Sequence, residues 1–394
     1  MKTSAFLYPW DVVGDPGAAA RVADLGVRQV TLASAYHSTR ALTPRHPRHR
    51  VVTAEHAAVL YPMDEGRWGD AELRPYAAGD WARADAYGEA AAALADAGLD
   101  VHTWVVLAHN SRLGAEHPST SVVNAYGDRY PWAPCIARPT VRTYLASLAA
   151  EAAVRPGAAG TELESLGWYG LAHLHAHDKI GGVPLGEAAQ YLMSLCFCSV
   201  CRAGYLSLGL DADELNTAVR RALKPVWSGV EGPGTPSGWQ GVERLLGAGL
   251  AATTLNWRVR TARTLQEATV TAVRAQAGPG FQVLLHADPH PHRTGANAGV
   301  DPAHILGIAD GVVLPCTGGA AEAMLTPFAA HCHESTVLAA NFTVVQGMGG
   351  SPHSLAADAA HARSLGATEL RLYHAGLASD ADLAAVADAL SRLG

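Results

Sequence analysis

Two carboxylates, each close to histidines, are the side chains in this chain best suited to acid–base chemistry. Glu164 lies in the segment TELESLGW, and Asp288 lies in LLHADPH, two residues after His286. A buried carboxyl group can keep a proton near neutral pH and act as a general acid. Two carboxylates that face one cavity are what cleavage of a glycosidic bond requires. We therefore expect Glu164 to be the general acid/base and Asp288 the nucleophile or second base.

Each of these carboxylates also has an alternative interpretation. Glu164 could be a salt-bridged carboxylate at a strand edge, and Glu162, which shares its face of the strand, is expected to be structural. Asp288 precedes a proline and could instead form an Asx turn, because aspartate often bonds to its own backbone there. Asp11, near the N-terminus, competes with Asp288 for the role of second carboxylate.

Polar and aromatic residues recur just after the short apolar segments, and the chain is rich in histidine, with 19. The run GLAHLHAHDK after Glu164 adds three alternate histidines, which could converge on a metal or a substrate or remain polar loop residues. Tryptophan rings at such positions suit stacking on sugar rings, with core packing as the alternative. The predicted substrate-binding residues are Trp10, Asp11, His37, His109, Asn110, Trp168, His177, His286, Tyr373 and His374.

Three of the six cysteines form the motif C-x-C-x2-C in CFCSVC, as Cys196, Cys198 and Cys201. The C-x2-C half is typical of zinc sites, and one further His, Asp or Cys would complete a tetrahedral set. The motif predicts a structural zinc as the cofactor, held by these three cysteines. Reduced buried thiols and a redox role are the alternatives.

Short apolar segments alternate with longer segments of helical periodicity, as in repeated βα units. Eight such units predict an α/β fold, a (β/α)8 TIM barrel, whose active-site face lies at the strand C-terminal ends. The expected strands are 4–9, 28–34, 101–107, 162–167, 281–287, 311–315, 336–344 and 369–374. The expected helices are 16–25, 79–97, 139–154, 319–331, 353–365 and 379–392.

Long insertions interrupt the repeat. The segment AATTLNW at 251–257 looks like a ninth strand, but helical periodicity continues from it, so we predict one helix over about 250–277. Residues 184–277 then form a helical insertion after strand four, and 36–78 and 108–138 are further βα insertions. We expect residues 1–394 to form a single barrel domain, because no interdomain linker is visible.

Composition excludes several classes of protein. There is no run of 18 apolar residues, which argues against a membrane span. The net charge of −7 argues against a nucleic-acid-binding protein, which normally presents a basic face. The first residues show no signal-peptide pattern, so we expect a cytoplasmic protein.

Several segments resemble the glycoside-hydrolase-like (β/α)8 barrel proteins, in particular an Ala-rich bacterial branch. The resemblance lies in NAYGDRYPWAPCIARPTVRTY (124–144), ELESLGWYGLAHLHAHDK (162–179), CFCSVC (196–201) and ELRLYHAGL (369–377). The resemblance implies a carbohydrate-active enzyme whose substrate is a small-molecule carbohydrate. The catalytic carboxylate that such hydrolases keep on strand four corresponds to Glu164. A cysteine cluster after strand four recurs in similar proteins.

One departure separates this chain from the large retaining clan of such hydrolases. That clan places its nucleophile on strand seven, where this chain has AANFTVVQGMGG, with Asn341 and no carboxylate. The remaining options are Glu164 with Asp288, a substrate-assisted reaction, or a non-hydrolytic use of the barrel. A lyase, epimerase or isomerase that uses Glu164 with His177 or His286, beside a divalent metal, is the second hypothesis. A non-catalytic barrel that binds carbohydrate or a partner protein is the third.

Overall fold

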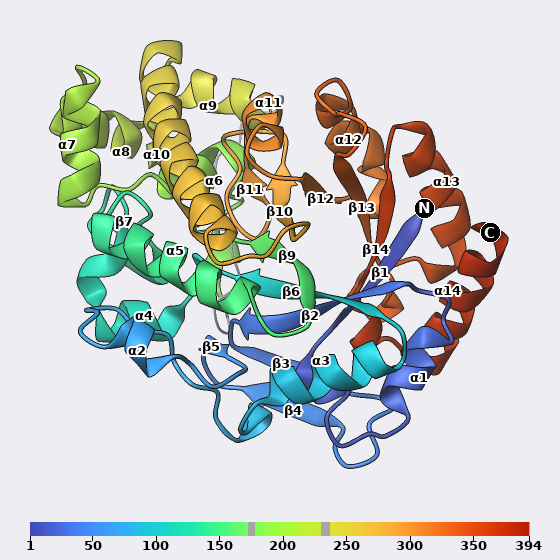
Figure 1. Ribbon diagram of the computed structural model, residues 1–394. Helices are drawn as coiled ribbons and strands as arrows, with labels where there is room; N and C mark the ends of the chain where they lie inside the picture. The colour runs from blue at the N-terminus through green and yellow to red at the C-terminus, as the bar shows by residue number, and fades with distance from the viewer. Residues whose placement is uncertain (172–177, 230–236, 394) are drawn as a thin grey trace.

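A computed structural model describes residues 1–171, 178–229 and 237–393, and it contains a closed barrel of eight parallel strands (Figure 1). Strand β1 pairs with both β2 and β14, which closes the sheet and confirms the predicted TIM barrel. The barrel strands are β1 (Lys2–Leu7), β2 (Gln29–Tyr36), β6 (Asp100–Val106), β9 (Ala158–Glu164), β10 (Gln282–Asp288), β12 (Gly311–Pro315), β13 (Val337–Thr343) and β14 (Glu369–Tyr373).

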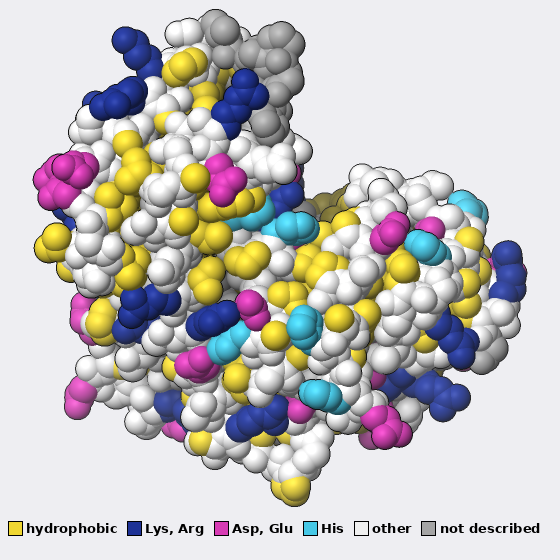
Figure 2. Space-filling view, turned by 90° about the horizontal axis from the view of Figure 1, so that it is seen from above, with side chains coloured by type: hydrophobic (Ala, Val, Ile, Leu, Met, Phe, Trp, Pro, Cys, Tyr) yellow, Lys and Arg dark blue, Asp and Glu magenta, His cyan; other side chains and the backbone are white. Residues whose placement is uncertain are grey.

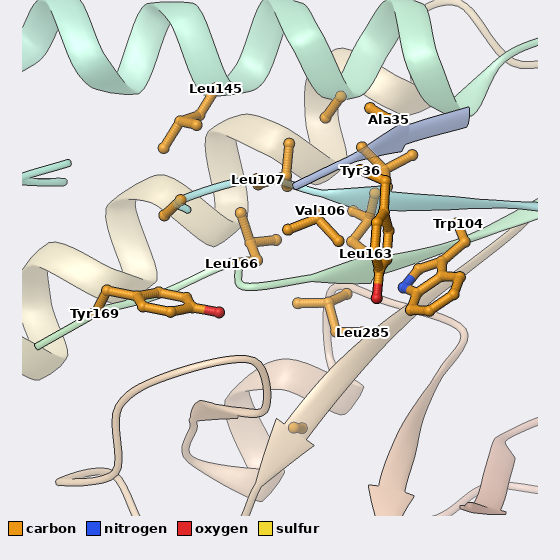
Figure 3. Close-up of a cluster of buried hydrophobic side chains, with 14 of the residues drawn as sticks. Ala35, Tyr36, Trp104, Val106, Leu107, Leu145, Leu163, Leu166, Tyr169 and Leu285 are labelled. Carbon is orange, nitrogen blue, oxygen red and sulfur yellow. The ribbon is translucent and has the colours of Figure 1, made fainter. Parts of the chain in front are cut away.

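These strands form because they are short apolar runs that are covered on both faces, as parallel strands must be. All eight residues of β2, QVTLASAY, are buried. Figure 3 shows Leu145 of α5 pointing toward the strands, and Tyr36 and Trp104 side by side on neighbouring strands. The hydrophobic core therefore lies between the barrel and its outer helices, and the barrel interior is a second packed layer.

The outer helices follow the strands at the predicted positions, with ends that differ by a few residues, except for the short helix over 302–306, which was not predicted. They are α1 (Ala18–Ala23), α3 (Ala86–Asp96), α5 (Pro139–Ala153), α11 (Pro302–Leu306), α12 (Ala321–Ala329), α13 (Leu355–Ser364) and α14 (Asp380–Leu393). The segment predicted as one helix over 79–97 is a 3-10 turn followed by α3, whose N-cap Asp85 accepts a hydrogen bond from the backbone of Gly88.

The long excursion between β9 and β10 is helical, as predicted. It contains α6 (Glu187–Met193), α7 (Ser199–Ser207), α8 (Ala212–Trp227), α9 (Gly238–Leu246) and α10 (Ala248–Arg274). The segment 251–257 lies inside α10, which packs on α5, so the helical periodicity was the correct signal. These helices gather on one side of the barrel, away from the two termini (Figure 1).

The other insertions carry small additional elements on the βα loops. They are the strands β3 (Thr39–Leu42), β4 (Val51–Ala54), β5 (Ala58–Val59), β7 (Ser121–Val123), β8 (Arg129–Pro134) and β11 (Ala298–Gly299), and the helices α2 (Glu65–Trp68) and α4 (Ser111–Glu116). The 3-10 turns are η1 (Pro9–Asp11), η2 (Asp80–Ala82), η3 (Pro118–Thr120), η4 (Ile180–Gly182), η5 (Thr317–Gly319), η6 (Gln346–Met348), η7 (Pro352–Ser354) and η8 (Ala375–Leu377). Within the described residues, every helix is too short or too polar to span a bilayer.

A cluster of three charged side chains, formed by Arg371, Glu162 and Glu369, lies buried inside the barrel. Arg371 of β14 is fully buried and donates from Nε to Glu162 Oε1 at 2.6 Å and from Nη1 to Glu369 Oε2 at 2.8 Å. Thr31 of β2 also donates to Glu162 Oε1, at 3.1 Å. Although burial alone would raise the pKa of Glu162, the Arg371 guanidinium lowers it to about 2. The sequence expectation of a structural Glu162 agrees with this network.

Removing the guanidinium should destabilise the barrel strongly. In Arg371→Met, Glu162 and Glu369 would remain buried without a counter-charge, and breaking a buried pair in this way costs about 3–5 kcal/mol. Urea denaturation at pH 7 measures the change. Arg363→Met, at an exposed position of α13, is the matched control and should stay within about 0.5 kcal/mol of the wild type. A loss below about 1 kcal/mol in Arg371→Met would contradict this account.

Candidate active site

Glu164 is the last residue of β9, at the C-terminal end where barrel enzymes place their catalytic groups. It is 2% exposed, and Trp104 of the neighbouring strand β6 donates from its indole Nε1 to Glu164 Oε2 at 2.7 Å. The registry of β6 with β9 places Trp104 beside Glu162, one inward position below Glu164. The indole thus reaches up from the barrel interior to fix one carboxylate oxygen.

His286 of β10 lies between the two glutamates of β9. Its Nε2 is 3.5 Å from Glu162 Oε2, and its Nδ1 is 3.9 Å from Glu164 Oε2. The ring is 2% exposed, and Phe6 packs edge-on against it with ring centroids 5.6 Å apart. The structure thus brings His286, predicted to bind substrate, together with the proposed catalytic carboxylate.

Aromatic rings surround Glu164 at the same level of the barrel. Tyr8 donates its hydroxyl to that of Tyr36 at 3.0 Å and lies 3.2 Å from His374 Nδ1. The Trp104 ring contacts Tyr36 and Tyr373, with centroids 4.6 and 5.7 Å apart. Burial raises the pKa of Tyr8, Tyr36 and Tyr373 well above the ordinary value, and the negative charge of Glu164 adds to the rise. These phenols therefore act as neutral hydrogen-bonding groups.

The backbone turns sharply directly after Glu164. Ser165 has a φ of 61°, a left-handed conformation that is costly for a residue other than glycine. Its hydroxyl lies 2.9 Å from the hydroxyl of Tyr169, and the Tyr169 ring stacks on His109 with centroids 4.9 Å apart. The turn therefore links the end of β9 to His109, which follows β6.

Asp288 ends β10, on the same face of the strand as His286. Its Oδ1 accepts hydrogen bonds from the backbone N–H and the Nδ1 of His290, both at 2.8 Å, and its Oδ2 is 4.0 Å from Arg293 Nε. The backbone contact is the Asx turn that the sequence left open as an alternative. Asp288 also lines a cavity of about 270 Å³ with Arg293 and Asn297.

Asp11 lies in a different environment from Glu164. Its Oδ2 accepts a hydrogen bond from the backbone N–H of Tyr8 at 2.9 Å, and it lines a small cavity with Arg45 and Leu383. A side chain at position 376 would collide with this carboxylate, so only glycine fits there. Burial raises the pKa of Asp11 to about 7, against the lowering effects of the Tyr8 N–H and of Arg45.

The remaining predicted substrate-binding residues are largely packed against protein. Trp10, 3% exposed, stacks on Tyr8, and Trp168, 5% exposed, donates its Nε1 to the carbonyl of Arg258 at 3.0 Å. Asn110 accepts a hydrogen bond as the N-cap of α4. His37 stacks on Tyr36, with ring centroids 4.2 Å apart. Each has a structural partner, so their contacts with a substrate remain predictions.

The structure describes four of the five histidines predicted to bind substrate. His37, His109, His286 and His374 lie near one another at the strand ends: the His37 and His109 rings are 5.1 Å apart, and both His37 and His286 influence His374. Burial lowers the pKa of His374 to about 3. His177 lies outside the described residues. Figure 2 shows further histidine side chains spread over the face seen from above, among hydrophobic ones.

The three predicted metal-ligating cysteines meet a fourth. The Sγ of Cys135, just after β8, lies 3.7 Å from those of Cys196 and Cys198 and 3.6 Å from that of Cys201. All four thiols are buried and lie within 4.8 Å of one another. The cluster thus joins the third βα insertion to the start of α7.

These thiols fit a tetrahedral zinc ion. Four sulfurs at about 2.3 Å from a tetrahedral zinc lie roughly 3.8 Å from one another, close to the observed separations. The backbone N–H groups of Val123 and Cys198 approach the Sγ of Cys196 at 3.5 Å, which suits a thiolate acceptor. Hydrogen bonds from neighbouring thiols, that of Cys135 foremost, lower the pKa of Cys198, which favours its thiolate.

Sequence reasoning missed several functional contacts. Cys135 lies in the segment 124–144, where a single cysteine carried no spacing signal. Trp104, Tyr8 and Tyr36 were not among the predicted site residues. Their positions depend on the barrel register, which places residues of distant segments side by side.

The charge state of Asp11 should make stability depend on pH. A folded pKa of about 7, above the ordinary value of 3.8, contributes stability that is fully present below pH 3.8 and is lost as pH rises through 7. Asp11→Asn removes this dependence. Between pH 5 and pH 8, the wild type should therefore lose roughly 2–3 kcal/mol relative to the variant in urea denaturation. Parallel curves for the two proteins would contradict the assigned burial of this carboxylate.

Comparisons with known proteins agree with this architecture. No protein-family model and no curated protein matches the chain. Among solved structures, it is similar to α-L-fucosidase isoenzyme 2 from Paenibacillus thiaminolyticus, with a TM-score of 0.61, 12% identity, and coverage of 100% of this chain but 49% of the fucosidase. The chain thus spans about half of that enzyme's length.

Two further structures match over nearly their whole length. The PgaB (BpsB) glycoside hydrolase domain from Bordetella bronchiseptica has a TM-score of 0.57 and 15% identity, with coverage of 99% of this chain and 97% of that one. The catalytic domain of β-amylase from Paenibacillus polymyxa has a TM-score of 0.57 and 11% identity, with coverage of 100% and 98%. The protein therefore has a glycoside-hydrolase-like (β/α)8 fold.

Proposed function

We propose that this protein is a carbohydrate-active enzyme that cleaves a glycosidic bond, with Glu164 as the general acid/base. The observation that carries the proposal is the setting of Glu164, a buried carboxylate at a strand C-terminal end among aromatic rings. Trp104 and His286 both approach Oε2 of this carboxylate. In the proposal, a sugar oxygen binds beside this buried carboxyl group and takes its proton.

Asp288 is the second carboxylate of the proposal. Because Leu163 pairs with Leu285, Glu164 lies beside His286, and Asp288 lies two residues further along the adjacent strand. Ideal strand spacing then gives roughly 8 Å between the Cα atoms of the two carboxylates. His290 Nδ1 lies 2.8 Å from Asp288 Oδ1, and Arg293 Nε lies 4.0 Å from its Oδ2.

The reaction would proceed between these two groups. Glu164 gives its proton to the leaving glycosidic oxygen as the bond from that oxygen to the anomeric carbon breaks. Asp288 either attacks the anomeric carbon or takes a proton from the water that attacks it. The separation of the two carboxyl groups in a substrate complex would distinguish these routes, because an inverting enzyme leaves room for water.

A second function has one specific observation in its favour. His286 lies 3.9 Å from Glu164, and Asp288 is engaged in an Asx turn, so Glu164 and His286 form an alternative acid–base pair. Such a pair suits proton transfer in a sugar lyase, epimerase or isomerase. In that case Asp288→Asn would leave turnover nearly unchanged, whereas Glu164→Gln would abolish it.

Substitution at Glu164 tests the proposal directly. On a panel of aryl glycosides and oligosaccharides, Glu164→Gln should lower kcat/KM by about 10²–10⁴-fold, the range for loss of general acid–base catalysis. Asp288→Asn should have a comparable effect, and Glu322→Gln, at an exposed position of α12, should have none. Full activity in Glu164→Gln would refute the assignment. Carbohydrate binding without turnover in the wild type would instead support a non-catalytic barrel.

We also propose that the four cysteines hold a structural zinc. The ion would carry out no chemistry on a substrate there, because four thiolates close its coordination sphere. Cys135 precedes α5, whereas Cys196, Cys198 and Cys201 lie at the start of α7, the second helix of the excursion. The site would therefore fasten the excursion to the barrel.

Metal analysis tests the zinc site. The purified protein should contain about one zinc per chain, and Cys135→Ser should lower both the zinc content and the thermal unfolding midpoint. Cys332→Ser, at a partly exposed cysteine outside the cluster, is the matched control and should change neither. A wild-type protein that stays free of zinc after incubation with the ion, with four reactive thiols, would contradict the site.

A further inference from the structure

The two ring nitrogens of His286 face two different carboxylates. Nε2 is 3.5 Å from Glu162 Oε2, and Nδ1 is 3.9 Å from Glu164 Oε2, on a ring that is almost fully buried. A neutral imidazole carries one N–H, so it can donate to only one of these carboxylates at a time. The position of the proton on the ring therefore decides whether Glu164 faces an N–H donor or the lone pair of Nδ1.

Glu162 is the negatively charged group that can decide which ring nitrogen of His286 carries the proton. Its Oε1 is occupied by Arg371 and Thr31, which leaves Oε2 facing the histidine. The Arg371 guanidinium, itself held by Glu369, keeps Glu162 ionised deep in the barrel. An ionised carboxylate beside one ring nitrogen holds the proton on that nitrogen and orients the ring.

We propose that His286 is the positioning residue that controls the proton of Glu164. Glu162 holds the imidazole with its proton on Nε2, so that the Nδ1 lone pair faces Glu164. The proton can then lie on Glu164 Oε2 or on Nδ1, and its transfer converts neutral His286 and protonated Glu164 into imidazolium and carboxylate. This inference rests on the proposed role of Glu164, and it gives the one labile proton of the pair two positions, Glu164 Oε2 and His286 Nδ1.

The charged and titratable groups around the ring are compatible with this role. From β9 the ring faces Glu162 and Glu164. From β14, Arg371 acts through Glu162, and His374 is close enough for its own pKa to be lowered by His286, after the larger effect of burial. Phe6 of β1 supplies an apolar contact on the ring. The two carboxylates are thus the negative neighbours that can favour the imidazolium.

Nuclear magnetic resonance of the full-length protein, labelled with ¹⁵N in the histidine rings, tests the coupling without a substrate. The ring signals that disappear in His286→Asn are assigned to His286. If that variant does not fold, through-space contacts between the ring and the protons of Phe6 provide the assignment. At neutral pH, we expect the Nε2-protonated tautomer in the wild type and loss of this preference in Glu162→Gln. In Glu164→Gln, removal of a neighbouring negative charge should lower the pH at which the ring signals change, by about one unit or more.

The outcomes separate the inference from the proposed function. Identical ring titrations in the wild type and Glu164→Gln, or a wild-type ring protonated on Nδ1 alone, would overturn the inference even in an active glycosidase. In an active protein, Glu162→Gln should shift the pH profile of kcat while KM changes little, whereas a purely structural role would leave the profile in place. Glu322→Gln should change neither the spectrum nor the profile. Coupled titration in a protein without glycosidase activity would refute only the proposed function.

Discussion

The buried ion pair between Arg371 and Glu162 is the interaction on which the inside of this barrel depends. Burying a carboxylate is costly unless a cation and hydrogen bonds compensate for lost water, and Arg371 supplies both. Because Arg371 comes from the last strand and Glu162 from the fourth, the pair also joins distant parts of the sheet across the interior. The other oxygen of Glu162 faces His286, and His286 in turn faces Glu164.

The site is therefore built in layers from the barrel interior outward. The ion pair lies below, His286 and Trp104 form the next level, and Glu164 stands where β9 ends. Tyr8 and Tyr36 beside it are buried and joined by a hydrogen bond, and electrostatic effects are stronger in such a low-dielectric setting. The helical excursion lies beside the barrel (Figure 1), and the cysteine cluster joins the start of its helix α7 to the preceding βα insertion.

Much of the fold could be predicted because its signals are local. Each strand is a short apolar run, and helical periodicity placed residues 251–257 inside α10 rather than in a ninth strand. The site was harder, because its contacts join segments far apart in sequence. Glu164 could be chosen from its strand-end position, but the Trp104 indole that binds it and Cys135 beside the C-x-C-x2-C motif depend on register and loop path. Asp288 was ambiguous for a physical reason, since an aspartate before proline can both cap a turn and face a cavity.

A crystal structure of Glu164→Gln with a bound oligosaccharide tests the central claim most directly. The variant keeps the shape of the site and removes the acid, so a substrate should remain intact. The account predicts a glycosidic oxygen within hydrogen-bond distance of the amide at position 164, and Asp288 on the opposite side of the scissile bond. The account would be contradicted by an oligosaccharide that binds away from position 164 while the aromatic rings around that position still bury its side chain.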